Sequence, residues 1–337
     1  GNQDISYNLE GNKSPREIAK LLRQYAIDRI NPDVILIPSV FEGFAENAVV
    51  EISDDASNIP TAVVLYDLIP LLNPKIYLTA LPRYKEFYMS GVELIKRAQI
   101  ILTISSYAKA EALNNLEINP NKVISISTGI DKDNFNQHAQ ATPTINRNWQ
   151  LTKDNYILYS GAYDPRKNLK SLILAYRELP KELQSRYKLV IAGKYIDAEI
   201  NELIPLTKQT NIAFLGYVTD QELIRLYQNC KLFVLPSKHE GFGMPALEAM
   251  CCGAVVIGSA ATSIPEVIGN TGALFDPNNI KSITDKIEEY LTNESKRKKL
   301  LLSNLEQVKK FSWEKTAKLA LDEVKKVANT RKGAKEW

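Results

Sequence analysis

Short apolar runs alternate along the chain with longer stretches in which apolar residues recur every three or four positions. The short runs are rich in β-branched residues and are typical of strands buried on both faces, whereas the longer stretches indicate amphipathic helices. This alternation predicts an α/β fold with parallel sheets covered by helices. The predicted strands are 34–37, 61–66, 100–104, 123–126, 156–159, 188–192, 212–215, 232–235 and 255–257, with 273–275 as an edge candidate.

Local signals mark where several helices begin. Ser14 followed by Pro15 and Glu17 predicts a capping box, and Thr219 followed three residues later by Glu222 predicts another. A helix is expected over about 83–97, and the Lys-rich tail over 279–326 is expected to be helical. The first thirteen residues are expected to be irregular.

The pattern divides into two halves joined by a polar stretch at 131–155. A chain of 337 residues is long enough for two domains. We predict an amino-terminal Rossmann-like lobe over 1–147, a carboxyl-terminal Rossmann-like lobe over 148–311, and a terminal helix over 312–337 that packs back toward the first lobe.

Composition excludes several classes of function. A net charge of +3, with 45% hydrophobic and 24% charged residues, is ordinary for a globular protein and gives no argument for nucleic-acid binding. Two histidines exclude a histidine-rich metal site, and no apolar run approaches the length of a membrane span. Three cysteines, Cys230, Cys251 and Cys252, suit buried thiols in a reducing cytoplasm. The basic run at 296–299 is interpreted as a solvated helix face, with weak contact to acidic lipid at the inner membrane face as the alternative.

The stretch at 236–250 carries the clearest candidate chemistry. It follows the predicted strand 232–235, and Gly241 and Gly243 then interrupt the apolar pattern before Pro245 starts a helix. Free N–H groups at a helix start attract anions and polar oxygens, and glycines let a ligand approach the backbone closely. Glu240 and Glu248, eight residues apart, flank this loop and could accept hydrogen bonds from a polyol such as a sugar or a ribose.

Other polar residues follow neighbouring predicted strands, and in open α/β sheets ligands bind along the edge formed by the strands' carboxyl ends. Arg166 and Lys167 lie just before a helix, which suits a diphosphate, although a solvated surface pair is the alternative for any such dipeptide. Lys194 and Tyr217 follow two further strands. Their convergence with the 240–243 loop indicates one ligand site on this edge.

Two segments, Gly-Ala-Tyr-Asp-Pro-Arg-Lys-Asn at 161–168 and Glu-Gly-Phe-Gly-Met-Pro-Ala-Leu-Glu at 240–248, resemble the retaining glycosyltransferases of the GT-B fold, in family 4 of the group 1 type. The second segment is similar to that family's Glu-x7-Glu motif. The resemblance extends over about 32–326 and favours relatives near the bacterial polysaccharide mannosyltransferases. It implies two Rossmann-like lobes whose parallel sheets face each other across a cleft.

The resemblance also implies a donor site, with no metal and no cofactor beyond a GDP- or UDP-type sugar donor. Arg166 and Lys167 would hold the diphosphate, Glu240 would contact the transferred sugar, and Glu248 would bind the ribose. Lys194 and Tyr217 would border the base. The implied catalytic residues are Glu240, Lys167 and Arg166, and the implied donor-binding residues are Gly161, Arg166, Lys167, Lys194, Tyr217, Glu240, Gly241, Phe242, Gly243, Met244 and Glu248.

Two departures from the family pattern stand in the amino-terminal half. Tyr66 occupies the position where many relatives have histidine, so Tyr66 and Asp67 are assigned only a location at the cleft, and Asp67 is as well explained as a cap of its loop. No strand and glycine-rich loop precedes Ser14, and about four strands are too few for a complete lobe. We therefore expect either a truncated chain or an incomplete lobe.

The leading hypothesis is a cytoplasmic, metal-independent retaining hexosyltransferase that moves a sugar, with GDP-mannose favoured, to a glycan or lipid-linked acceptor of a surface polysaccharide. The alternative is a non-catalytic partner subunit that keeps the fold and binds carbohydrate. A nicotinamide-dependent dehydrogenase is a distant third hypothesis, because no G-x-G-x-x-G follows an early strand.

Overall fold

The computed structural model describes residues 14–45, 48–52, 59–138, 151–195 and 200–335 of the 337-residue chain. The predictions for residues 1–13 and for the middle of the 131–155 link lie outside the described residues. The chain divides into two compact units, the first made of residues 1–103, 109–125 and 318–337 and the second of 104–108 and 126–317. The domain limits drawn from the sequence stay a prediction.

The first unit contains a four-stranded parallel sheet in the order β1-β2-β3-β4. The four predicted strands are confirmed as β1 (Ile35–Ile37), β2 (Thr61–Leu65), β3 (Ile100–Thr103) and β4 (Val123–Ser125). The expectation that the first strand is buried is wrong in part. Because β1 is an edge strand with a neighbour on one side only, Leu36 is less covered than its registered partner Ala62 and is 48% exposed.

The helices of the amino-terminal part follow the signals in the sequence. The first helix begins at a capping box in which Ser14 and Glu17 exchange hydrogen bonds, and it ends at Asn31 in the left-handed conformation. The predicted helix at 83–97 is confirmed within one residue at its start. The elements are α1 (Pro15–Ile30), α2 (Ile69–Leu72), α3 (Pro74–Tyr77), α4 (Pro82–Arg97), α5 (Ser106–Asn115) and the 3-10 turn η1 (Pro120–Lys122).

The second unit contains a six-stranded parallel sheet in the order β10-β9-β8-β5-β6-β7. The chain proceeds from β5 through β6 to β7 on one side and then returns to β8, β9 and β10 on the other. Strand order therefore reverses between β5 and β8, which is where ligands bind in sheets of this kind. The strands are β5 (Tyr156–Ser160), β6 (Lys188–Ala192), β7 (Ile212–Gly216), β8 (Leu232–Leu235), β9 (Val256–Ser259) and β10 (Leu274–Phe275).

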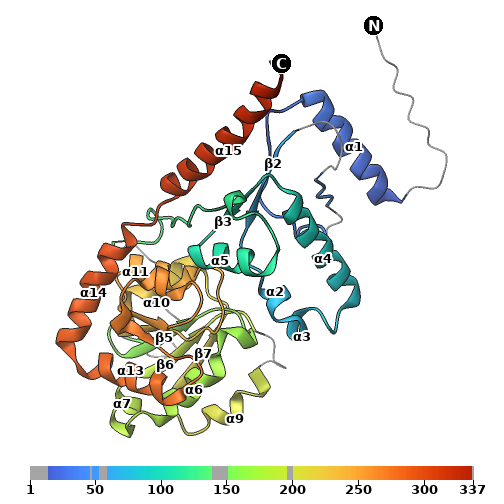
Figure 1. The fold of residues 1–337 in the computed structure, drawn as a ribbon. Coiled ribbons are helices and arrows are strands. Elements are labelled where there is room, and N and C mark those ends of the chain that lie inside the picture. Colours follow the sequence, from blue (N-terminus) through green and yellow to red (C-terminus); the bar gives the residue numbers. More distant parts are fainter. Residues whose placement is uncertain (1–13, 46–47, 53–58, 139–150, 196–199, 336–337) are drawn as a thin grey trace. The chain divides into compact units, whose positions relative to one another are not determined.

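Helices cover both faces of this sheet, with α10 and α11 on one side of the central strands and α6 and α13 on the other (Figure 1). The central strands are buried along their whole length, as continuous apolar runs predict. Thr219 and Glu222 form the predicted capping box of α10. The elements are α6 (Leu169–Glu178), α7 (Lys181–Arg186), α9 (Ile204–Thr207), α10 (Asp220–Asn229), α11 (Met244–Cys251), α12 (Ile264–Ile268), α13 (Ile280–Thr292), α14 (Glu294–Val308), α15 (Trp313–Lys335) and the 3-10 turns η3 (Pro165–Lys167) and η4 (Thr271–Ala273).

The basic run at 296–299 lies on α14 and is amphipathic. Arg297 is buried and pairs with Glu294, whereas Lys296 is exposed and forms an ion pair with Glu289 at 2.5 Å. Lys298 lies 3.8 Å from Glu294 and is also exposed. Within the described ranges, every helix is too short or too polar to cross a bilayer.

Candidate functional site

The loop after β5 places two cations at the point where strand order reverses. Asp164 caps the turn η3 by accepting a hydrogen bond from the Arg166 N–H at 2.9 Å. Asn168 then adopts the left-handed conformation, with φ of 59°, before α6 begins. Its side-chain amide donates to the carbonyl oxygens of Pro236 and Pro277, at 3.1 and 2.8 Å. This buried amide therefore ties the loop after β5 to the loop after β8.

The loop after β8 holds Glu240 through its backbone. The Glu240 N–H donates to Thr262 Oγ1 at 3.1 Å, and its carbonyl oxygen accepts from Ser263 Oγ at 2.8 Å. Gly243 has a φ of 109°, a conformation that a side chain would strain, and it immediately precedes α11. Pro245 lies in the first turn of α11, as predicted.

The Glu240 carboxylate is paired with both cations of the neighbouring loop. It is only 7% exposed, and its Oε2 lies 2.9 Å from Arg166 Nη1. Its Oε1 accepts a hydrogen bond from Ser237 Oγ at 2.8 Å and lies 3.6 Å from Lys167 Nζ. A buried carboxylate needs such partners, because an unpaired one would cost several kcal/mol, on the order of 3–5.

The two cations are used differently. Arg166 Nη1 donates both to Glu240 and to the carbonyl oxygen of His239 at 2.8 Å, and Arg166 Nε lies 3.3 Å from Asp164. These contacts join Arg166 to the Glu240 loop, and its implied role at the diphosphate stays a prediction. Lys167 has a longer contact with Glu240, so its ammonium can turn toward a ligand at a smaller cost.

The backbone of the glycine loop adds hydrogen-bond donors. The N–H groups of Gly241, Phe242 and Gly243 donate to no acceptor within the described ranges. They lie directly before the amino terminus of α11, where the helix dipole favours negative charge. The loop can therefore bind anionic or polyol oxygens without rearranging its own hydrogen bonds.

Glu248, one turn into α11, is linked to the end of β5 through Tyr227. The Tyr227 hydroxyl donates to Glu248 Oε2 at 3.1 Å and lies 2.8 Å from Ser160 Oγ. Burial raises the pKa of the Glu248 carboxyl above its usual range, and the hydrogen bond from Tyr227 opposes that shift. The sequence motifs did not reveal the hydrogen-bonded partners of the two glutamates, which are Tyr227 and Ser160 near Glu248 and Ser237 beside Glu240. Only the spacing of Ser237, three residues before Glu240, was a usable signal in the sequence.

The other predicted residues are less closely connected to this cluster. Lys194 and Tyr217 follow β6 and β7, on the side of β5 away from β8, and the side chain of Tyr217 is 74% exposed. Gly193 N–H donates to the Gly216 carbonyl at 2.8 Å, which joins the ends of these two strands. The structure thus brings together Gly161, Arg166, Lys167, Glu240, Gly241, Phe242, Gly243, Met244 and Glu248 around the ends of β5 and β8.

Tyr66 and Asp67 belong to the first unit, at the end of β2. The Asp67 carboxylate accepts a hydrogen bond from the Ile69 N–H at 3.0 Å, which is the capping role offered as its alternative. Tyr66 is 51% exposed. Their predicted location at the cleft stays a prediction.

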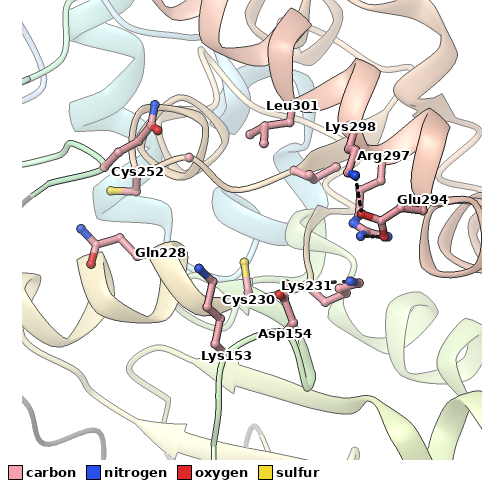
Figure 2. A pocket seen from close by; sticks show the side chains of 13 residues that line it. Lys153, Asp154, Gln228, Cys230, Lys231, Cys252, Glu294, Arg297, Lys298 and Leu301 are labelled. Atoms are coloured by element: carbon pink, nitrogen blue, oxygen red, sulfur yellow. Dashed lines mark hydrogen bonds and ion pairs between the residues drawn. The ribbon is translucent and has the colours of Figure 1, made fainter.

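A pocket of about 360 Å³ lies at the opposite edge of the six-stranded sheet (Figure 2). Lys153 and Asp154 precede β5 there, and Lys231 precedes β8. Lys231 lies 3.9 Å from Asp154. Burial raises the pKa of the Cys230 thiol, which lines this pocket and stays protonated. The predicted donor-binding residues do not line it.

The reversed strand order and the two converging loops are typical of α/β lobes that bind ligands, and comparison with solved structures identifies the fold. The chain is similar to sucrose-phosphate synthase from Thermosynechococcus elongatus, with a TM-score of 0.71, 18% identity, and coverage of 96% of this chain and 82% of that chain. It is also similar to HepE from Anabaena in complex with UDP and glucose, with a TM-score of 0.71, 16% identity, and coverage of 93% and 83%. These likenesses show the GT-B fold and confirm the predicted fold class.

Sequence comparison then identifies the family. Residues 142–301 match the model of the glycosyl transferases group 1. The serotype-specific mannosyltransferase WbdA of Escherichia coli is 39% identical over 326 residues, which is 94% of this chain and 40% of WbdA. The O-antigen chain mannosyltransferase B of Escherichia coli is 36% identical over 66% of this chain and 59% of its own length. The chain belongs to the glycosyl transferases group 1 family, and it spans about two fifths of the length of WbdA.

Proposed function

We propose that the chain is a retaining mannosyltransferase that transfers mannose from GDP-mannose to a glycan or lipid-linked acceptor of an O-antigen-type polysaccharide. The observation that carries the proposal is the Glu240 carboxylate, held beside Lys167 and the amides of Gly241 to Gly243 at the switch point of the sheet. The similarity to two mannosyltransferases of O-antigen synthesis supports the choice of sugar.

The contacts within the site support a role for each residue. Lys167 and the amides at the start of α11 bind the diphosphate, and Glu240 accepts hydrogen bonds from hydroxyls of the sugar. Arg166 keeps the Glu240 loop in place, since its contacts go to that loop. Glu248 accepts a hydrogen bond from the ribose, with Tyr227 fixing its orientation.

Transfer breaks the bond between the anomeric carbon and the sugar-side phosphate oxygen, and the electron pair stays on that oxygen. The acceptor hydroxyl bonds to the anomeric carbon on the same face, which retains configuration, and its proton passes to the departing phosphate. Negative charge on the phosphate increases as the bond breaks. The Lys167 ammonium and the fixed amides therefore stabilise the transition state more than the ground state.

The experiment is a screen of nucleotide sugars for transfer or slow hydrolysis, with the anomeric configuration of the product followed by NMR. We expect turnover with GDP-mannose, an α-mannosyl product, and loss of turnover in Glu240→Gln. Glu289→Gln, which changes a half-buried, lysine-paired carboxylate on α13, is the matched control and should keep wild-type turnover. Binding of GDP-mannose without turnover, under all acceptors tried, would instead support the non-catalytic partner subunit.

A further inference from the structure

Three consecutive peptide groups of the glycine loop are held by the hydroxyls of two buried serines. Ser263 Oγ lies 2.8 Å from the Glu240 carbonyl oxygen and 2.7 Å from the Phe242 carbonyl oxygen, so its single proton is shared between the two. Ser105 Oγ donates to the Gly241 carbonyl oxygen, which lies between them in the chain, at 2.7 Å. Both serines are 0% exposed, and both belong to the second unit. Two side chains therefore bind all three carbonyl groups.

The same three peptide groups carry the available N–H donors of this loop. In a planar trans peptide the C=O and N–H bonds point in opposite directions. The N–H groups that share a peptide with the three bound carbonyls are those of Gly241, Phe242 and Gly243, and none of them donates to an acceptor among the residues that the structure describes. Because Ser263 binds the first and third carbonyls, the N–H groups of Gly241 and Gly243 both point away from Ser263.

These hydrogen bonds oppose rotation of the peptide groups. Two of the three N–H groups belong to glycines, whose backbone adopts alternative conformations readily. A peptide that turned over would exchange its N–H for a carbonyl oxygen, and the partial negative charge of that oxygen would repel a phosphate. Such a turn would also leave the serine hydroxyl without its acceptor, and an unmade hydrogen bond in a protein interior costs free energy. The serines therefore favour the one arrangement that presents donors.

We propose that Ser263 and Ser105 are positioning residues of the donor site, which keep these three N–H groups directed at oxygens of the donor's diphosphate. This inference rests on the proposed function. Each serine acts through the peptide groups that it binds rather than through contact with the ligand. Donors that are fixed beforehand need no reorganisation as negative charge develops on the departing phosphate, so they lower the barrier to transfer more than they strengthen the binding of GDP-mannose.

The first test is Ser263→Ala, which removes one hydroxyl. Affinities for GDP and guanosine are measured by calorimetry, and kcat and KM for GDP-mannose by steady-state kinetics. We expect GDP affinity and kcat to fall about 10-fold, because the donors act on a charged group, whereas KM should change by less than about 3-fold. Guanosine affinity should be unchanged, because guanosine has no phosphate. Ser105→Ala should cause the same selective loss, and it provides an independent test if Ser263→Ala does not fold.

Thr284→Val is the matched control. The Thr284 hydroxyl on α13 is also buried and also lies close to two backbone carbonyl oxygens, those of Ala175 at 3.1 Å and Ile280 at 3.0 Å. Its loss should lower the melting temperature and leave GDP affinity and kcat at wild-type values. Wild-type GDP affinity and kcat in the serine variants, or an equal loss of affinity for guanosine and GDP, would overturn this inference alone. If the wild-type chain binds no GDP, the proposed function and this inference both fail.

Discussion

Replacing Arg166 by methionine should destabilise the second unit, because the buried Glu240 carboxylate would lose its cationic partner. Glu240 is 7% exposed and would lose its 2.9 Å partner, keeping only Ser237 and the more distant Lys167. Removing one member of a buried ion pair costs about 3–5 kcal/mol. The Arg166 side chain is 21% exposed and two partners remain, so we expect a smaller loss of about 2–3 kcal/mol in the free energy of unfolding.

Urea denaturation at pH 7, followed by circular dichroism, measures this loss in a double-mutant cycle with Glu240→Gln. With an uncharged glutamine at 240, the cost of Arg166→Met should drop below about 1 kcal/mol, because no buried charge is left unpaired. The control is Lys281→Met, whose exposed ion pair with Asp285 should make no measurable contribution to the free energy of unfolding. An equal cost of Arg166→Met in both backgrounds would refute the assigned pairing.

Three further changes test other parts of the site. Lys167→Ala should lower turnover about 10- to 100-fold in steady-state kinetics, and near-normal turnover would remove Lys167 from the mechanism. Burial raises the pKa of the Glu248 carboxyl, so its favourable contribution to stability is present at low pH and is lost as pH rises through that pKa. Thermal melts from about pH 4 to 7 should therefore show Glu248→Gln gaining stability relative to wild type as the pH rises. A difference in stability that stays constant with pH would contradict this. Gly193→Ala should reduce the free energy of unfolding by on the order of 1–3 kcal/mol and so lower the melting temperature by several degrees, because the added Cβ would lie 1.9 Å from the Gly161 carbonyl oxygen. An unchanged melting temperature would be inconsistent with this close approach.

Local signals predicted most of the fold, because capping boxes and apolar runs act over a few residues. Thr219 and Glu222 start α10 as expected, and Pro245 lies in the first turn of α11. The exposure of Leu36 was missed, since an apolar run does not reveal which strand forms the edge of a sheet.

Arg166, Lys167 and Glu240 lie at the ends of their strands as expected, whereas several of their hydrogen-bond partners could not be predicted; the binding site itself stays a prediction. Arg166 and Glu240 were assigned to one edge, but their direct ion pair depends on β5 and β8 being neighbours, which is a property of strand order. The bonds from Ser160 through Tyr227 to Glu248 join three separate elements, and no spacing in the sequence encodes them.

Hydrogen–deuterium exchange with and without GDP can locate the donor site without requiring an acceptor. We expect slower exchange in two segments, 160–168 after β5 and 240–247 after β8, and no change around the pocket at 228–231 and 294–301 (Figure 2). The protection at both loops should disappear in Lys167→Ala. Protection confined to the pocket at the opposite edge, or no protection at saturating GDP, would contradict the assignment of the donor site.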